Sequence, residues 1–241
     1  VDIVSTSPAL AQYLSRNASV FDAVIGGDFF SEWIGQASLQ SDLREFLDRE
    51  SDYEAKLDTA RRWTKELHFR IGVHLLRGLI DTKEAGVQYN DLARAVVGAI
   101  WPAVVEEFAR RYGPPPGRGA VVLGMGSLGA GMLNTGSDLD LIVIYDPADV
   151  NISQGPRQLA TRSYYARLTQ AMITALTVPM AQGRLYEVDM RLRPSGNQGP
   201  VATSWASFQD YQRHNAWVWE HLALTRADYV AGPSDLGQDI E

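Results

Sequence analysis

A very short spacing between a glycine-rich turn and a pair of aspartates limits the folds open to this chain. Residues 124–129 read GMGSLG, the G-x-G-x-x-G pattern of a dinucleotide-binding loop, with Asp146 about twenty residues on as a ribose ligand. A parallel crossover needs about a dozen residues or more, including a helix. Only ten residues, Leu128 to Ser137, separate Ser127 from Asp138, and three of them are glycines. Because only a helical turn or two fits there, the spacing disfavours a nicotinamide dinucleotide enzyme.

The same residues are typical of a phosphate-binding turn followed by a metal-binding acidic pair. Backbone amides at Gly126 and Ser127 would open a short helix, where an anion is favoured. In an extended strand, residues i and i+2 share a face, so Asp138 and Asp140 would project together beside that turn. Mg²⁺ prefers one or two carboxylates plus substrate phosphate. We therefore expect a divalent metal and a phosphate group at this place.

A third acid lies on a later segment that alternates strictly between apolar and charged residues, from Tyr186 to Arg193. This alternation predicts a half-buried strand with Asp189, Arg191 and Arg193 on its polar face. Asp189 would complete a two-metal site, and the arginines would offset charge on a transferring phosphoryl group. Two plainer interpretations stay open: Asp-x-Asp as a solvated edge or turn cap, and Asp189 with Arg191 as a structural ion pair.

The chain divides at a run of prolines and glycines, which predicts a helical region over residues 1–112, a linker over 113–119 and a second domain over 120–241. The second domain alternates strand and helix patterns. We expect strands over 120–123 and 139–145, the latter central in its sheet, a helix over 157–177, and a helix or helix pair over 208–229. The predicted fold class is α+β, with a mixed sheet flanked by helices.

The front region carries three apolar series with helical spacing. They begin near Ser7, near Asp52 and at Asn90, which we expect to be an N-cap. We expect this region to be a scaffold. Its two histidines, His68 and His74, are six residues apart and so do not share a helix face as a metal-binding pair would.

Composition narrows the classes of function further. The chain has 241 residues, 29 acidic against 22 basic, and no cysteine. Disulfides, thiol catalysis and cysteine-bound zinc are excluded, and the net charge of −7 weighs against a broad nucleic-acid surface. No uninterrupted apolar run reaches the roughly 18 residues of a membrane span. Since no secretory signal is seen at the start, we expect a cytoplasmic location without membrane or nucleic-acid partners.

The order Gly-Ser, about ten residues, Asp-x-Asp and a later acid resembles the DNA polymerase beta-type nucleotidyltransferase superfamily. Longer stretches are similar to one family within it, the glutamine synthetase adenylyltransferases. They are SDLDLIVIYD, GRLYEVDMRLRPSGNQGPVATS and AWVWEHLALTRADYVAG. The resemblance is strong over about the last 120 residues, weaker over the helical front, and closest to the adenylylating half of a long bifunctional enzyme.

The resemblance implies a polymerase beta-like fold and a transfer of AMP from ATP to a tyrosine hydroxyl of glutamine synthetase, with release of pyrophosphate, in nitrogen regulation. It implies Asp138, Asp140 and Asp189 as catalytic residues that hold Mg²⁺ or Mn²⁺, with Asp189 also a candidate general base. Gly126 and Ser127 would grip the outer phosphates of ATP. Glutamine synthetase would be the partner, together with a nitrogen signal protein of the PII type in the full-length enzyme.

Two departures from the family pattern keep an alternative open. Ser127 stands where the family usually has Lys, and Asn215 where it usually has Glu. The alternative is a catalytically weak module that senses nucleotide or docks a partner. The roles of Arg191 and Arg193 also stay undecided, because these arginines could pair with Glu187 and Glu220 instead of the substrate. The aromatic spacing of the later segment is more typical of a core than of a site; its residues are Trp217, Trp219, Glu220 and His221.

Overall fold

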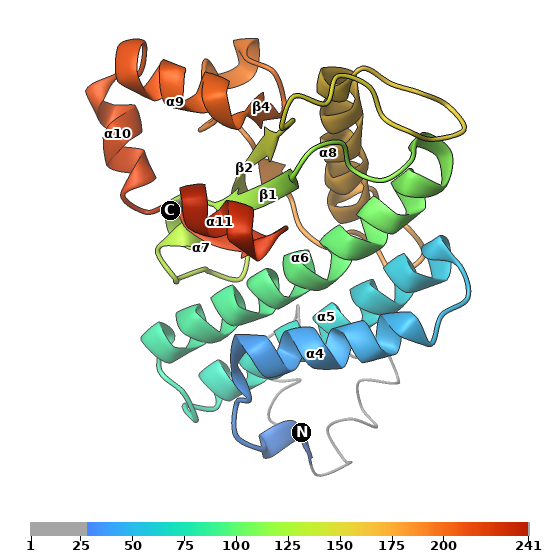
Figure 1. Ribbon diagram of the computed structural model, residues 1–241. Helices are drawn as coiled ribbons and strands as arrows, with labels where there is room; N and C mark the ends of the chain where they lie inside the picture. The colour runs from blue at the N-terminus through green and yellow to red at the C-terminus, as the bar shows by residue number, and fades with distance from the viewer. Residues whose placement is uncertain (1–27, 241) are drawn as a thin grey trace.

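The structure is a computed structural model that describes residues 28–240, and the first predicted helical series, near Ser7, lies outside the described residues. Three long helices form the front of the molecule: α4 (Gly35–Asp48), α5 (Tyr53–Leu76) and α6 (Thr82–Tyr112). A short 3-10 helix, Asp28–Phe30, precedes them. Figure 1 shows α6 crossing the middle of the molecule, with α4 and α5 on one side of it and the sheet on the other.

The start of α6 corrects the prediction that Asn90 caps this helix. The helix begins eight residues earlier, at Thr82, because the Asp81 side chain accepts a hydrogen bond from the Glu84 amide at 2.7 Å. Asn90 is instead buried inside the helix. The predicted start of the second series is confirmed, since Asp52 caps α5 by accepting from the Ala55 amide at 2.9 Å.

The predicted α+β class with a mixed sheet flanked by helices is confirmed. The strands are β1 (Gly119–Gly124), β2 (Leu139–Asp146), β3 (Val188–Asp189), β4 (Thr203–Ser204) and β5 (Asp228–Ala231). Their order is β3-β2-β1-β5, with β4 also paired to β2. The strand β1 is antiparallel to β2 and β5, while β3 and β4 are parallel to β2. The central position expected for β2 is therefore confirmed.

Alternate residues of β1 and β2 bury two opposite faces of the sheet. On one face, Leu139, Leu141 and Val143 share a core with α6 and with α8 (Thr161–Thr177). On the other, Ile142 and Ile144 pack with residues of α9 (Trp205–His214) and α11 (Ser234–Ile240). Burial on both faces explains why β2 reads as an almost continuous apolar run. None of the described helices combines the length and the apolar character needed to cross a bilayer.

The connection from β1 to β2 is as short as the spacing of the sequence predicts. Between the strands lies α7 (Gly126–Gly129), which is four residues long, and the strands are antiparallel. The long crossover helix that a dinucleotide-binding unit would place after Gly129 is absent from this connection, which lies wholly within the described residues.

Three boundaries differ from the predictions. The helix expected from Arg157 begins at Thr161, because residues 157–160 are held extended: the Arg157 amide donates to Arg111, and Ala160 bridges Ile152. The helix pair expected over 208–229 is confirmed as α9 and α10 (Val218–Leu224), but Tyr229 belongs to β5.

The strand expected over Tyr186–Arg193 pairs with β2 only at Val188 and Asp189. The Asp189 carboxylate itself accepts the Arg191 amide at 2.8 Å, which turns the chain out of the strand. The following loop contains a 3-10 helix at Gly196–Gln198.

Acidification provides a test of the packing between α5 and α6. His68 lies against Tyr89 with ring centroids 4.5 Å apart, and burial lowers the pKa of His68 to about 4. Since the unfolded chain takes up this proton near pH 6.5, the free energy of unfolding falls between pH 6.5 and 4. We expect the drop between pH 7 and 4.5, measured by urea unfolding, to be smaller by about 2–3 kcal/mol in His68→Phe. Equal pH profiles for His68→Phe and the unchanged chain would contradict the assignment.

Candidate active site

The three predicted acids lie on neighbouring segments at one edge of the sheet. Asp138 immediately precedes β2, Asp140 is the second residue of β2, and Asp189 ends β3. The parallel pairing of these strands places Asp140 directly opposite Asp189. The sheet register therefore brings together acids that are about fifty residues apart in the chain.

The glycine turn is packed directly onto this acidic edge. The Met125 amide donates to the Asp140 carbonyl at 2.8 Å. Gly126 has a φ of +53°, and a Cβ built there would overlap the Asp140 carboxylate. Glycine is thus needed at this position both for its backbone conformation and for the close approach of the acid.

Ser127 lies on the first turn of α7 with its side chain exposed. No side chain caps the start of this helix. The turn that precedes Ser127 is packed on Asp140 through Met125 and Gly126.

The pKa values of the two facing acids are shifted in opposite directions. Burial raises the pKa of Asp140, and the negative charges of Asp189 and Asp138 raise it further. The pKa of Asp189 is lowered, chiefly because it accepts a hydrogen bond from Arg191. Repulsion among the three acids is the condition that a bound cation relieves.

Arg191 supplies a positive charge at this edge. Its Nε lies 2.7 Å and its Nη2 2.5 Å from Asp189 Oδ2, although its side chain is 72% exposed. This is the ion pair left open as an alternative by the sequence. The described residues contain no group of three acidic or histidine side chains close enough to hold a metal ion. The pair Asp140 and Asp189 has the right donor atoms for Mg²⁺, provided that Arg191 releases Asp189.

Arg193 has a different set of contacts. It donates to the Met190 carbonyl at 2.7 Å and to the Gly199 carbonyl at 3.4 Å, and so closes the loop after β3. Among the described residues, neither Arg191 nor Arg193 forms an ion pair with Glu187 or Glu220. Glu187 pairs with Arg184.

Glu220 belongs to the corner between α9 and α10. It is buried and accepts the Tyr211 hydroxyl at 2.9 Å and the Trp217 amide at 2.8 Å, which caps α10. Asn215 is the C-cap of α9, and its amide donates to the Tyr211 carbonyl at 2.8 Å.

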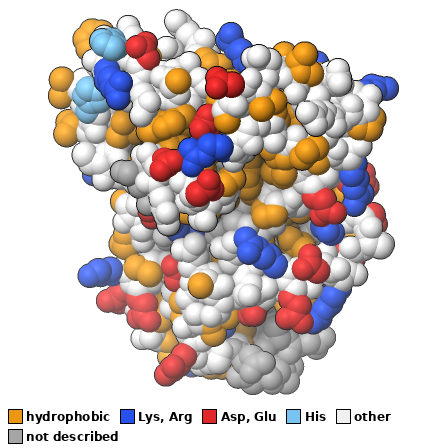
Figure 2. Space-filling view, in the orientation of Figure 1, with side chains coloured by type: hydrophobic (Ala, Val, Ile, Leu, Met, Phe, Trp, Pro, Cys, Tyr) orange, Lys and Arg blue, Asp and Glu red, His pale blue; other side chains and the backbone are white. Residues whose placement is uncertain are grey.

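The expectation that the tryptophans form a core is wrong, since Trp217 and Trp219 are 70% and 56% exposed. His221 is exposed too and bonds the Gln212 carbonyl. Figure 2 shows apolar and histidine side chains at this corner of the surface.

Two hollows adjoin the acidic edge. A groove of about 660 Å³ contains Asp138, Asp189, Arg191 and Arg193. A cavity of about 600 Å³ lies between the edge and α5, and Asp138 and Glu187 contribute to the walls of both hollows. The front region was expected to be a scaffold, but α5 forms a wall of this cavity. The spacing of apolar residues along α5 did not predict this cavity, because a helix face that lines a cavity has the same period as one that packs against a core.

A glycine-to-alanine pair tests the contact between the turn and Asp140. Gly126→Ala incurs both a left-handed backbone and the overlap with Asp140, whereas Gly131→Ala, with a φ of +78° and open space around it, incurs only the first. We expect Gly126→Ala to lower the free energy of unfolding by about 1–3 kcal/mol more than Gly131→Ala in urea titrations. Equal losses of unfolding free energy in the two variants would show that Asp140 is not in close contact with the turn.

Comparison with known proteins places this geometry in a family. The profile of glutamate-ammonia ligase adenylyltransferase matches residues 1–241. The chain is 48% identical over 233 residues to a bifunctional glutamine synthetase adenylyltransferase/adenylyl-removing enzyme of Brucella suis, covering 96% of the chain and 24% of that protein. A protein of the same name from Mesorhizobium japonicum is 44% identical over 240 residues, which cover 99% of the chain and 24% of the relative. The chain thus spans about a quarter of the length of these relatives.

Proposed function

Because the chain belongs to the glutamate-ammonia ligase adenylyltransferase family, we propose that it transfers AMP from ATP to a tyrosine hydroxyl of glutamine synthetase and releases pyrophosphate. The observation that carries the proposal is the packing of the Gly126 turn on Asp140, which stands opposite Asp189. A phosphate turn next to facing carboxylates is the arrangement that nucleotidyl transfer needs.

Each predicted residue has a place in this reaction. Gly126 and Ser127 bind the outer phosphates of ATP, while Asp138, Asp140 and Asp189 hold Mg²⁺ or Mn²⁺. The ion, when bound, neutralises triphosphate charge and lowers the pKa of the acceptor hydroxyl. Exposed Arg191 can reach from Asp189 to a phosphate oxygen, whereas Arg193 keeps the loop after β3 in place.

The chemical step exchanges one phosphorus–oxygen bond for another. The tyrosine oxygen bonds to the α-phosphorus while the bond from that phosphorus to the oxygen bridging to the β-phosphate breaks, and pyrophosphate leaves with the electron pair. The acceptor proton passes to the acidic edge. Asp189 is a poor proton acceptor while Arg191 holds it, because the ion pair lowers its pKa. Its role as general base therefore requires the same release of Arg191 that metal binding requires.

Metal affinity tests this release directly. Arg191→Gln removes the cation that competes for Asp189, so the free protein should bind Mn²⁺ several-fold more tightly, as measured by electron paramagnetic resonance without nucleotide. The matched control is Arg184→Gln, which removes an arginine paired with Glu187 and should leave Mn²⁺ affinity unchanged. Weaker Mn²⁺ binding in Arg191→Gln would contradict the competition.

The transfer itself is tested with α-labelled ATP, Mg²⁺ and glutamine synthetase. Asp140→Asn should reduce label on the acceptor by at least about a hundredfold, since it removes a charge that holds the metal on the triphosphate. Asp146→Asn is the control on the same strand, where the acid pairs with Arg118 at the far end of β2. Undiminished transfer in Asp140→Asn would refute the metal assignment.

A catalytically weak nucleotide-binding module is the second candidate. It is favoured by Ser127 in place of the usual Lys and by the engagement of Asp189 with Arg191. Nucleotide binding without label transfer in the wild-type chain would select it. The division at residues 113–119, a cytoplasmic location without nucleic-acid or membrane partners, and control by a PII-type protein in the full-length enzyme stay predictions.

A further inference from the structure

The cavity between α5 and the acidic edge, here called the α5 cavity, is large enough for a small molecule. Its volume of about 600 Å³ lies within the range of about 300–1,000 Å³ that is usual for ligand pockets. One wall is a single face of α5, which contains Lys65, Phe69 and Gly72. The opposite wall contains Tyr186 and Asp138, from the segments that lead into β3 and β2.

A positive charge without a counter-ion lies at one end of the α5 cavity. Lys65 forms no ion pair with any described residue, and its amine lies beside Gly183. Burial lowers the pKa of Lys65, and the positive charge of Arg61, one turn earlier, lowers it further. Two cations held together are unfavourable unless an anion offsets them.

Arg61 contributes a second positive charge next to Lys65, behind the wall of the α5 cavity. It is fully buried, and its Nη2 donates to the carbonyls of Ala175 and Val178 at the end of α8, at 2.9 and 3.0 Å. Its Nε and Nη1 have no hydrogen-bond partner. The negative charge of Asp58 offsets part of the Arg61 charge. Lys65 is therefore the cation that an external anion would neutralise.

Tyr186, which lines the α5 cavity, carries an unused hydrogen-bond donor within the cavity wall. The Tyr186 hydroxyl is buried and has no partner, and its pKa is raised by burial and by neighbouring Tyr89, so it stays protonated. A buried polar group without a hydrogen-bond partner is unfavourable. Buried Phe69 and half-buried Leu185 provide apolar wall nearby.

We propose that the α5 cavity is a second ligand site that takes a small organic anion. Its carboxylate or phosphate group pairs with Lys65, and its uncharged body packs against Phe69 and Leu185. The site adjoins the acidic edge through Asp138 but does not include Gly126, Ser127 or Asp140. It therefore stands independently of the proposed transfer reaction.

Anilinonaphthalene sulfonate is a suitable probe, because it joins an anionic group to an apolar body and fluoresces on burial. We expect it to bind the intact chain, and Lys65→Gln to raise its dissociation constant about tenfold or more, as the loss of a charge-assisted hydrogen bond does. Gly72→Leu should also abolish binding, because its side chain would enter the cavity from α5 without removing any charge. Thermal unfolding of both variants checks that they are folded.

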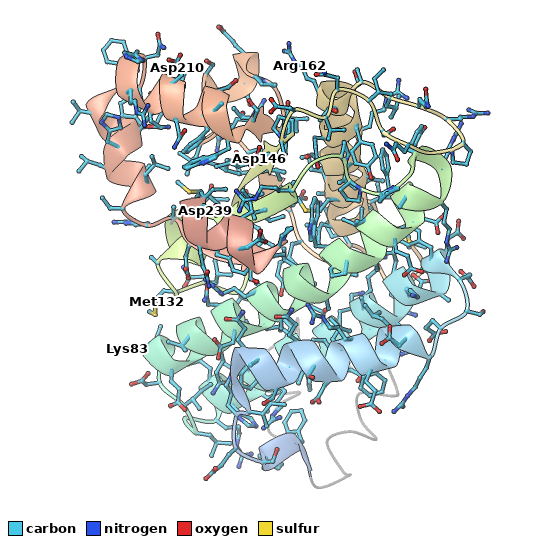
Figure 3. The ribbon with its side chains drawn as sticks, in the orientation of Figure 1. Lys83, Met132, Asp146, Arg162, Asp210 and Asp239 are labelled. Atoms are coloured by element: carbon cyan, nitrogen blue, oxygen red, sulfur yellow. The ribbon has the colours of Figure 1, made fainter. Side chains whose placement is uncertain are left out.

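Two control variants separate the α5 cavity from other sites. Lys83→Gln removes an exposed lysine in the first turn of α6, outside the lining of the cavity, and should not change binding (Figure 3). Leu222→Gln alters the exposed apolar corner at α10, the other surface that could attract the probe. If Leu222→Gln abolishes the signal while Lys65→Gln leaves it unchanged, the proposal is refuted.

Competition then identifies the chemistry of the ligand. Displacement by inorganic phosphate indicates a phosphorylated ligand and displacement by glutarate a carboxylate, and either result supports the site. Failure of both to displace the probe refutes an anion site. Addition of ATP without metal should leave probe binding unchanged; displacement by ATP would show that the α5 cavity belongs to the nucleotide site and is not a second one.

Discussion

Burial of β2 on both faces is the constraint on which the rest of the structure depends. Its residues alternate between a core shared with α6 and α8 and a core shared with α9 and α11, so the strand cannot shift by one residue without exchanging the two cores. Because β1 and β3 pair directly with β2, the register of β2 also sets the glycine turn and Asp189. The candidate site is thus a consequence of how one apolar strand is buried.

The arginines of this protein differ in what their ion pairs do. Several arginines stabilise the fold: Arg94 pairs with Asp228 and links α6 to β5, and Arg118 joins Asp146 to Asp239 of α11. Asp146 and Asp239 accordingly lie near each other in Figure 3. Arg191 differs, because it is largely exposed while the acid it holds is largely buried. An exposed side chain can leave its partner at little cost in packing, so this pair suits a site that must open.

Sequence reasoning succeeded where one local pattern admitted one structure. The apolar run of β2 and the short α7 follow from period and spacing. It failed where two local signals competed. Asn90 looked like a cap, but Asp81 caps the helix; Tyr186–Arg193 alternated like a strand, but the side chain of Asp189 turned the backbone away after two paired residues.

The tryptophans of α10 show a related limit. Trp217 and Trp219 are exposed, while Glu220 is the buried member of that segment. Hydrophobicity alone predicts the reverse, because it does not register that a carboxylate bonded to a tyrosine hydroxyl and a backbone amide can be buried at low cost.

By itself the amino-acid sequence determined the residues of the candidate site: a glycine turn, three acids and arginines, with a spacing too short for a crossover helix. It also determined the central strand, because eight residues from Leu139 to Asp146, mostly apolar, must be buried on both sides. Only the tertiary structure decided which acid faces which, that Arg191 holds Asp189, and that α5 encloses a cavity beside Asp138. These are contacts between segments far apart in the chain, and local periodicity carries no information about the distance between such segments.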